Sequence, residues 1–280
     1  YPENVLRKGN AFSYCLRLLA AKYKKQSDVI KTELCEVKTA FYNSNNQLEK
    51  MIKYQDAPHT DFEKILINIY PYHKKDLVEQ WAINLAYDGN INGAIEMINL
   101  YPDAGKDTLY GNPFNGRIND CHDCDHEAFQ KTKYSKLSFL KKMIEMDAVA
   151  KANPKEAATN YYLLGNAYYN MTYFGNARRM HETTIQTYYC CRYVYYSFEN
   201  GKDSRDDLKA PFYNCDKAAT YYIKAMEAST DKNFKAKCCW MLAKCEMNDY
   251  YETSDFIKNR EKVDFKSGKY YKKMKTEFLK

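Results

Sequence analysis

The sequence contains very little glycine and proline. Its 280 residues include 10 Gly and 7 Pro, whereas average proteins use about 7% Gly and about 5% Pro. Nucleotide-binding α/β folds, β-sandwiches and β-barrels need one of these residues at most of their corners. The shortage therefore argues against those folds and favours long helices joined by short loops.

Two further absences narrow the class of function. No stretch approaches 18 consecutive apolar residues, so we expect no membrane-spanning segment. The motifs for phosphate loops, dinucleotide binding, serine hydrolases and zinc proteases are also missing; His181-Glu182, for example, is followed by Thr-Thr-Ile, which leaves H-E-x-x-H incomplete. We therefore expect a binding protein and not an enzyme.

Tyrosine is the residue that the sequence has in excess. There are 28 Tyr, 13 Phe and 2 Trp, and a hydrophobic content of 45% with 28% charged residues is enough for a folded core. Apolar residues recur at helical spacing in four windows, 12–24, 61–70, 77–87 and 136–150, and Asp61 stands where an N-cap is expected. Many tyrosines occur as doublets, which predicts one ring packed inside and its neighbour about 100° around the helix.

Two segments interrupt the helical pattern. Residues 102–127 contain clustered Gly and Pro and have no helical period, and residues 197–214 form a second polar stretch. A structureless stretch longer than about 15 residues is uncommon in a compact domain and often functional. The sequence thus predicts three parts: N-terminal helical hairpins over 1–101, an irregular insertion with a Cys/His cluster over 102–135, and helical hairpins ending in a basic helix over 136–280.

The clearest repeat pattern begins at Tyr161. It reads Tyr161-x-x-Leu164-Gly165-x-x-Tyr168, and Ala177 follows twelve residues after the glycine. Small residues such as Gly165, Ala177 and Ala218 allow two helices to approach closely, while large ones such as Tyr161, Tyr168 and Tyr222 fill the space between neighbouring hairpins. Weaker matches occur over 77–101 and 212–247.

This pattern resembles the tetratricopeptide repeat family. The spacing departs from the family, because Ala177 and Ala218 are 41 residues apart against about 34 per repeat, and His181 stands where the family has Phe. The resemblance implies an all-α fold of degenerate helical hairpins stacked in a right-handed solenoid with a long irregular insertion. It also implies a scaffold or adaptor that binds another protein or a peptide within a larger assembly.

A looser resemblance concerns the insertion and the end of the chain. The segment NDCHDCDH and the ending FKSGKYYKKMKTEFLK look similar to uncharacterised tetratricopeptide-like cell-envelope proteins of Bacteroidetes-type bacteria. The similarity implies a periplasmic or outer-membrane-associated scaffold that serves secretion or surface assembly. The sequence starts at Tyr1 without an initiator Met, as expected of a processed chain or of part of a longer one.

The residues expected to bind the partner follow from the repeat pattern. Tyr162, Asn166, Tyr169 and Asn170 lie one position away from the core series, which favours a place on the concave face of the solenoid. Tyrosine suits such a surface because it offers a large contact area and a hydroxyl at low entropic cost. The alternative is that these tyrosines pack between helices.

The six residues from Cys121 to His126 are the only cluster with the composition of a metal site. Cys121 and Cys124 form a C-x-x-C half-site for tetrahedral zinc, and His126 could supply a third ligand. A fourth ligand would come from elsewhere, for example His122, His181 or Cys245. One structural Zn is thus the predicted cofactor, and a metal-binding module or metalloenzyme is an alternative function. A Cys121–Cys124 disulfide, or a plain turn whose Asp and His cap helices, are the other interpretations.

The remaining cysteines and charges point to ordinary structural roles. Cys15, Cys215, Cys238 and Cys239 fall in helical patterns and are expected to act as small buried hydrophobes. Residues 256–280 carry nine Lys or Arg and three Asp or Glu, most of the net charge of +7. A basic aromatic tail could touch RNA, but the near-neutrality of the rest makes a nucleic acid partner the weaker alternative. The other interpretation is a last helix with its aromatic residues packed inward and its lysines in water.

Overall fold

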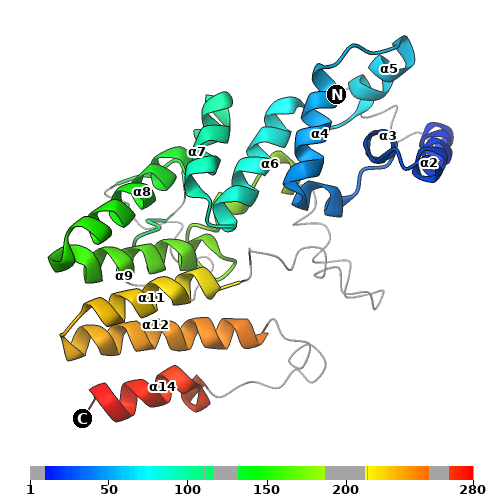
Figure 1. Cartoon of the computed structure of the whole chain (residues 1–280). Helices are drawn as coiled ribbons and strands as arrows, with labels where there is room; N and C mark the ends of the chain where they lie inside the picture. The colour runs from blue at the N-terminus through cyan, green and yellow to red at the C-terminus, as the bar shows by residue number, and fades with distance from the viewer. Residues whose placement is uncertain are drawn as a thin grey trace. The chain divides into compact units, whose positions relative to one another are not determined.

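The computed structural model describes residues 10–109, 111–115, 132–186, 212, 214–251 and 265–279. Every regular element in these residues is a helix, and they contain no β-strand; an isolated antiparallel bridge joins Thr108 to Ser135. The prediction of an all-α fold is confirmed (Figure 1). No helix in the described part of the chain is long and apolar enough to cross a lipid bilayer.

The helices confirm the four windows of helical spacing, which correspond to α2, α5, α6 and α8. The α-helices run in chain order as α2 (Asn10–Lys25), α3 (Val29–Cys35), α4 (Asn45–Asp56), α5 (Asp61–Ile69), α6 (Lys74–Tyr87), α7 (Ile91–Leu100), α8 (Lys136–Ala152), α9 (Pro154–Met171), α11 (Asp216–Ala228), α12 (Lys232–Tyr251) and α14 (Lys269–Lys273). Short 3-10 turns lie at η1 (Thr39–Asn43), η2 (Pro102–Gly105), η3 (Arg178–His181) and η5 (Phe265–Ser267), and a π-helical turn, η6 (Met274–Phe278), follows α14.

The chain divides into two compact units, each built from more than one stretch. Of the described residues, unit 1 holds 10–84, 96–104 and 183–186, and unit 2 holds the others. The predicted boundaries at 101/102 and 135/136 follow chain order, whereas the units follow contacts. The three-part division therefore stays a prediction about the sequence, and the two units are used below.

Helix starts in unit 1 are fixed by side-chain caps. Thr60 accepts a hydrogen bond from the N–H of Glu63, and the Glu63 carboxylate accepts one from the N–H of Thr60 at 3.0 Å, which completes a capping box for α5. The prediction that Asp61 is the cap is therefore wrong by one residue, because Asp61 is already the first helical residue. At α3, Asp28 accepts from the N–H of Lys31 at 3.0 Å.

Unit 1 has a continuous apolar core. α2 contributes Leu16 and Ala20, and the hydroxyls of Tyr42 and Tyr70 meet at 2.7 Å inside it. The buried members of this core are Leu16, Ala20, Leu34, Cys35, Phe41, Tyr42, Leu48, Met51, Leu66, Ile69, Tyr70, Tyr72, Leu77 and Ile185. Burial of these side chains is the main term that stabilises the unit.

Unit 2 is a series of helices in which each packs on the next. α8 contacts α9, α9 contacts α11, α11 contacts α12 and α12 contacts α14 (Figure 1). Only Asn153 separates α8 from α9; its side chain caps α9 by accepting from the N–H of Lys155, and Pro154 occupies the first helical position. The short connection makes α8 and α9 a helical hairpin.

The predicted close approach of helices is present where α9 meets α11. A Cβ atom placed on Gly165 would lie 2.6 Å from the ring of Tyr222, so a larger residue cannot occupy this position without moving the ring. Ala177 and Ala218 are also buried, as the small-residue pattern predicts. The helices of unit 2 thus meet through small residues set against a large aromatic ring.

The doublets divide as predicted in two of the four cases whose burial the structure describes; Tyr270 and Tyr271, for example, are both half-buried. Tyr162 and Tyr222 are buried, while their neighbours Tyr161 and Tyr221 are half-buried. At 168–169 both rings are buried, and Tyr168 stacks on Tyr221 with centroids 5.3 Å apart. The exception at 168–169 arises because α9 is covered on more than one side.

The C-terminal residues confirm the interpretation of an inward-facing aromatic tail over 265–279. Tyr271, Met274 and Phe278 pack against Ala236 and Cys239 of α12. The lysines of this segment at 266, 269, 272 and 275 are exposed. Amphipathic packing therefore accounts for the alternation of aromatic and basic residues there.

Candidate functional site

The four residues predicted to bind a partner lie on α9 but not on its surface. Tyr162 is 4% exposed, and Asn166, Tyr169 and Asn170 are fully buried. Their predicted place on an accessible face is wrong, because α8, α11 and the segment 111–115 all cover α9. These residues belong to the interior of unit 2, where a partner cannot reach them in the folded chain.

The buried asparagines bind the chain's own insertion. Asn170 Nδ2 donates to the carbonyl of Pro113 at 2.9 Å, and Asn166 Nδ2 donates to that of Phe114 at 3.5 Å. Asn176, which follows α9, donates to the carbonyl of Asn112 at 3.3 Å. Three side-chain amides thus hold three consecutive main-chain carbonyls, and we call Asn166, Asn170 and Asn176 the amide clamp.

Each member of the clamp is itself held in place by other polar groups. Asn166 Oδ1 accepts from the Tyr222 hydroxyl at 2.8 Å, and Asn170 Oδ1 accepts from the N–H of Asn176 at 3.3 Å. The held segment adds Phe114, whose ring packs against Phe139 with centroids 5.4 Å apart. The amides of Asn166 and Asn170 are tolerated in the interior because the nitrogen and the oxygen of each have hydrogen-bonding partners.

The predicted zinc ligands Cys121, Cys124 and His126 lie outside the described residues, as does His122. Two other proposed ligands lie inside them. His181 stacks on Phe212 with centroids 4.1 Å apart, and burial together with the charge of Lys136 lowers its pKa to about 3. Cys245 is buried, and desolvation raises the pKa of its thiol well above the usual value. No group of three metal-ligating side chains occurs among the residues that the structure describes.

Three of the four cysteines that were predicted to act as small buried hydrophobes are placed as predicted, either at the N-cap of α11 or on α12. Cys215, Cys238 and Cys239 are buried, and desolvation raises the pKa of Cys238 to about 12. Cys15 is exposed, which corrects its predicted place in the core. The error came from assigning a single apolar face to α2, whose apolar residues lie on both sides.

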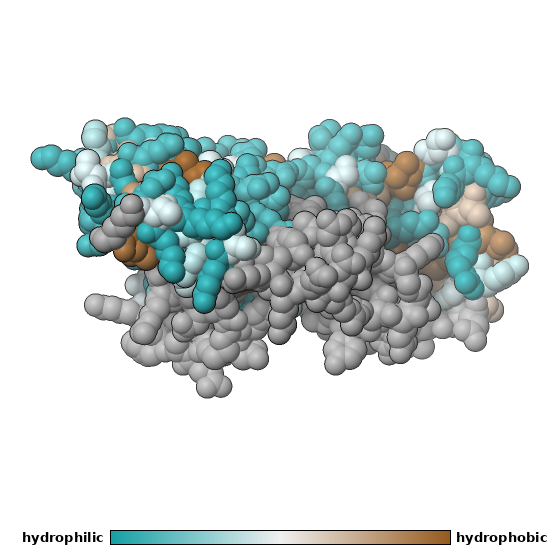
Figure 2. All heavy atoms as spheres, turned by 90° about the horizontal axis from the view of Figure 1, so that it is seen from below, coloured by the Kyte–Doolittle hydropathy of each residue, from teal (hydrophilic) through white to brown (hydrophobic). Residues whose placement is uncertain are grey.

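α2 carries an exposed apolar stripe that the sequence analysis did not find. Its members occur at spacings of three and four residues and lie opposite the buried Leu16 and Ala20. We call this stripe the α2 outer face; it consists of Ala11, Tyr14, Cys15, Leu18 and Ala21. The side chains of Tyr14 and Leu18 are 57% and 55% exposed. Figure 2 shows brown apolar patches among the hydrophilic side chains of the face viewed.

The charged residues of α2 itself are all of one sign. α2 contains Arg17, Lys22, Lys24 and Lys25 and no acidic residue. Each of these four side chains is exposed. The stripe is therefore an apolar surface bordered by positive charge. The signal for it was present in the sequence, as the unusual combination of a two-sided apolar helix with no carboxylate.

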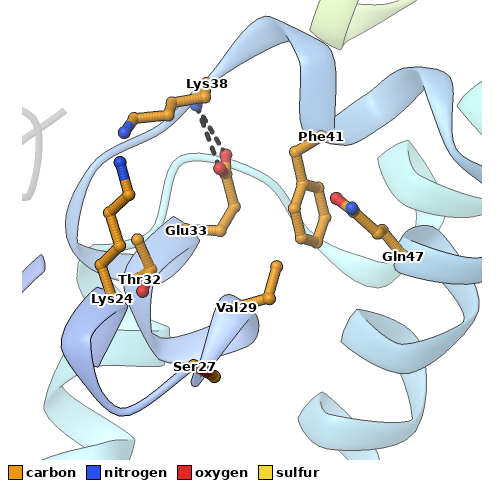
Figure 3. Close-up of a pocket in the computed structure, with 8 residues that line it drawn as sticks. All are labelled: Lys24, Ser27, Val29, Thr32, Glu33, Lys38, Phe41 and Gln47. Carbon is orange, nitrogen blue, oxygen red and sulfur yellow. Dashed lines mark hydrogen bonds between the residues drawn. The ribbon is translucent and has the colours of Figure 1, made fainter.

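A pocket of about 320 Å³ lies beside the C-terminal end of α2 (Figure 3). Its lining comes from four successive parts of unit 1: Lys24 and Ser27 after or at the end of α2, Val29, Thr32 and Glu33 of α3, Lys38 and Phe41 at η1, and Gln47 of α4. In Figure 3 the ammonium groups of Lys24 and Lys38 lie on the same side, across from the ring of Phe41.

Glu33 fixes the inner end of this pocket. Its side chain is buried, and its two oxygens accept from the N–H of Lys38 at 2.9 and 3.1 Å. The hydroxyl of Tyr42 donates to Glu33 Oε1 at 2.6 Å. These bonds hold the residues between α3 and η1, so the pocket has a fixed wall.

The turn that brings α2 into α3 is strained at one residue. Ser27 has φ 59°, in the left-handed region that favours glycine. The N–H of Asp28 donates to the carbonyl of Tyr23, and that of Ser27 donates to the carbonyl of Lys24, which is the Schellman pattern. A side chain is thus kept, at a conformational cost, at the edge of the pocket.

Comparisons with protein-family models, with curated proteins and with solved structures found no match to this chain.

Proposed function

We propose that this protein is a non-enzymatic scaffold that binds another protein within a larger assembly through the α2 outer face. The partner is an amphipathic helix whose apolar side faces Tyr14 and Leu18 and whose borders are acidic. The single observation that supports the proposal most is the exposed apolar stripe at helical spacing on α2. Scattered apolar residues are normal on a surface, but a continuous stripe rimmed by polar residues marks an interaction site.

The chemistry of the partner follows from what borders the stripe. α2 offers positive charge from Arg17, Lys22 and Lys25 and no carboxylate, so acidic side chains on the partner are attracted and basic ones repelled. An apolar helix surface is complementary to another helix, because ridges of one pack into grooves of the other. An acidic amphipathic helix satisfies both requirements.

We also propose that the helices form degenerate tetratricopeptide-like hairpins stacked as a right-handed solenoid. The hairpin of α8 and α9, the contact of Gly165 with Tyr222, and the neighbour-to-neighbour packing of unit 2 support this arrangement. An apolar outer face on α2 is what a scaffold needs if a partner covers it.

The test is recovery of the native complex with the tagged intact chain and its variants. The double variant Tyr14→Asp plus Leu18→Asp should lose the partner, because both side chains are more than half exposed and neither belongs to the core of unit 1. A matched control places Asp at Phe62 and Ile65, an exposed apolar pair on α5, and should keep the partner. Circular dichroism and thermal melting establish that each variant is folded.

Support requires that the recovered protein contain an acidic amphipathic helix, and that this helix made as a peptide bind the wild-type chain and not the double variant. Retention of the partner by the α2 variant contradicts the proposal. The proposal is also contradicted if the wild-type chain binds vesicles of anionic lipid and the double variant does not. In that case the stripe would belong to a helix that lies on a membrane surface.

A further inference from the structure

The pocket beside α2 has the size and the lining of a site for a small molecule. Its volume of about 320 Å³ falls within the range of about 300–1,000 Å³ for small-molecule sites, which are mostly apolar with a few placed polar groups. The apolar part is provided by Val29 and Phe41 together with the aliphatic stems of Lys24 and Lys38. An apolar body of modest size therefore suits the pocket.

The lysines of the pocket give it a preference for an anion. Lys24 makes no ion pair or side-chain hydrogen bond within the described part of the chain. Lys38 pairs with Glu36 at 3.1 Å, but both side chains are nearly half exposed, and such pairs contribute only about 0–1 kcal/mol. A ligand carboxylate can therefore recruit Lys24 directly and Lys38 by replacing Glu36.

Glu33 gives the ligand an orientation. Its buried carboxylate lies at the inner end of the pocket, where its charge repels a second anion and attracts an N–H donor. The ligand's carboxylate must then stay with the lysines, while a nitrogen group points toward Glu33. Thr32 and Gln47 also line the pocket; in Figure 3 Thr32 lies beside Lys24, and Gln47 lies beyond the ring of Phe41.

From this arrangement we propose that the pocket binds an α-amino carboxylate with an apolar side chain. The carboxylate lies between Lys24 and Lys38, the apolar side chain lies against Phe41 and Val29, and the nitrogen lies toward Glu33. A free amino acid and the C-terminal residue of a peptide share this chemistry. The inference does not rest on the proposed scaffold function, because the pocket lining contains no residue of the α2 outer face.

The experiment uses the full chain and three probes: L-phenylalanine and two derivatives that each differ from it in one group. L-phenylalanine has the carboxylate and a free ammonium, N-acetyl-L-phenylalanine has the carboxylate and an amide N–H, and L-phenylalaninamide lacks the carboxylate. Isothermal titration calorimetry and ligand-observed NMR should detect binding of at least one of the first two. The amide should bind at least about tenfold more weakly, because a charge-assisted bond is lost.

The first two probes also distinguish the sources of the ligand. Tighter binding of L-phenylalanine supports a free amino acid, since its ammonium interacts with Glu33. Equal or tighter binding of the acetylated probe supports a peptide C-terminus. Both outcomes support the site, whereas no binding by either probe, or equal binding of the amide, overturns it.

Variants of the rim test the assignment of residues. Lys24→Gln and Lys38→Gln should each weaken binding of the carboxylate probes by about five- to tenfold. Glu36→Gln should strengthen it by about two- to threefold, because Lys38 is then released from its ion pair. Lys22→Gln is the matched control, since Lys22 is exposed on α2 but does not line the pocket. An equal effect of Lys22→Gln, or no effect of the other three, overturns the proposal.

Discussion

Both units bury polar side chains that have hydrogen-bonding partners, but most of the exposed large apolar side chains of the described residues belong to unit 1. Unit 2 buries polar side chains and gives them partners, as in the amide clamp and the bond of Tyr222 to Asn166. Unit 1 leaves apolar side chains in water on the α2 outer face and keeps a pocket and a strained serine beside it. A buried and fully partnered interior stabilises a fold, whereas exposed apolar surface and local strain are tolerated where they serve binding.

The largest expected effect comes from overfilling unit 2. Gly165→Val should lower the free energy of unfolding by about 3 kcal/mol or more, because its side chain would overlap the buried ring of Tyr222. Ala148→Val, at an exposed position of α8, should cost less than about 1 kcal/mol. Urea denaturation of both variants measures the difference, and equal costs would mean that α9 and α11 do not meet as closely as described.

The next effect comes from removing one polar partner inside unit 2. Tyr222→Phe should cost about 1–3 kcal/mol, because the buried Oδ1 of Asn166 loses its donor. Tyr161→Phe serves as the control on α9, since that ring is only half-buried. The different burial of the two hydroxyl groups within unit 2 predicts a clear difference between these two deletions in chemical denaturation. A neutral Tyr222→Phe would show that the interior does not depend on its hydrogen bonds.

A smaller effect should separate two turns of the same type. Gly89 after α6 has φ 87° and makes the same pair of Schellman bonds as Ser27 after α2. Ser27→Gly should therefore stabilise the chain by about 0.5–1 kcal/mol, while Gly89→Ser should destabilise it by about 1 kcal/mol. Thermal melting of the two variants gives the signs directly. If both substitutions changed the stability in the same direction, Ser27 would not be strained, and the units would not differ in this respect.

The smallest effect at neutral pH concerns His181, whose influence on stability appears only in acid. Its pKa is about 3 in the folded chain and about 6.5 when unfolded. Between these values the unfolded chain binds more protons, so stability falls as the pH drops from about 6.5 toward 3. The variant His181→Phe should lose this dependence, and its free energy of unfolding relative to wild type should rise as the pH is lowered. Urea titrations at several pH values test this, and a difference that is constant with pH contradicts it.

The sequence was a good guide to which residues are helical and to where helices approach closely. The period of apolar residues identified α2, α5, α6 and α8, and the small residue at Gly165 correctly indicated a close contact with a large ring. These features are local, or depend on volume alone. The cap of α5 was missed by one residue, because Thr60 and Asp61 are both good N-cap residues and only the capping box distinguishes them.

Which side of a helix faces water could not be predicted in the same way. Asn166 and Asn170 are polar and lie beside the core series, so a two-sided picture of α9 placed them at the surface. In the structure the insertion supplies a third covering layer, and the amides face main-chain carbonyls of Pro113 and Phe114 instead of water. Contacts of this kind join residues more than fifty positions apart, and no periodic pattern records them. The opposite error occurred at Cys15, an apolar residue on the side of α2 that nothing in the described chain covers.

The bonds at the base of the insertion anchor the chain on both sides of residues 116–131. The N–H of Leu109 donates to the carbonyl of Tyr134 at 2.8 Å, and that of Lys136 donates to the carbonyl of Asp107 at 3.1 Å. The amide clamp holds main-chain atoms, so it sets few demands on side chains apart from Phe114 and Gly111. The chain is therefore attached to unit 2 mainly through main-chain atoms on both sides of residues 116–131.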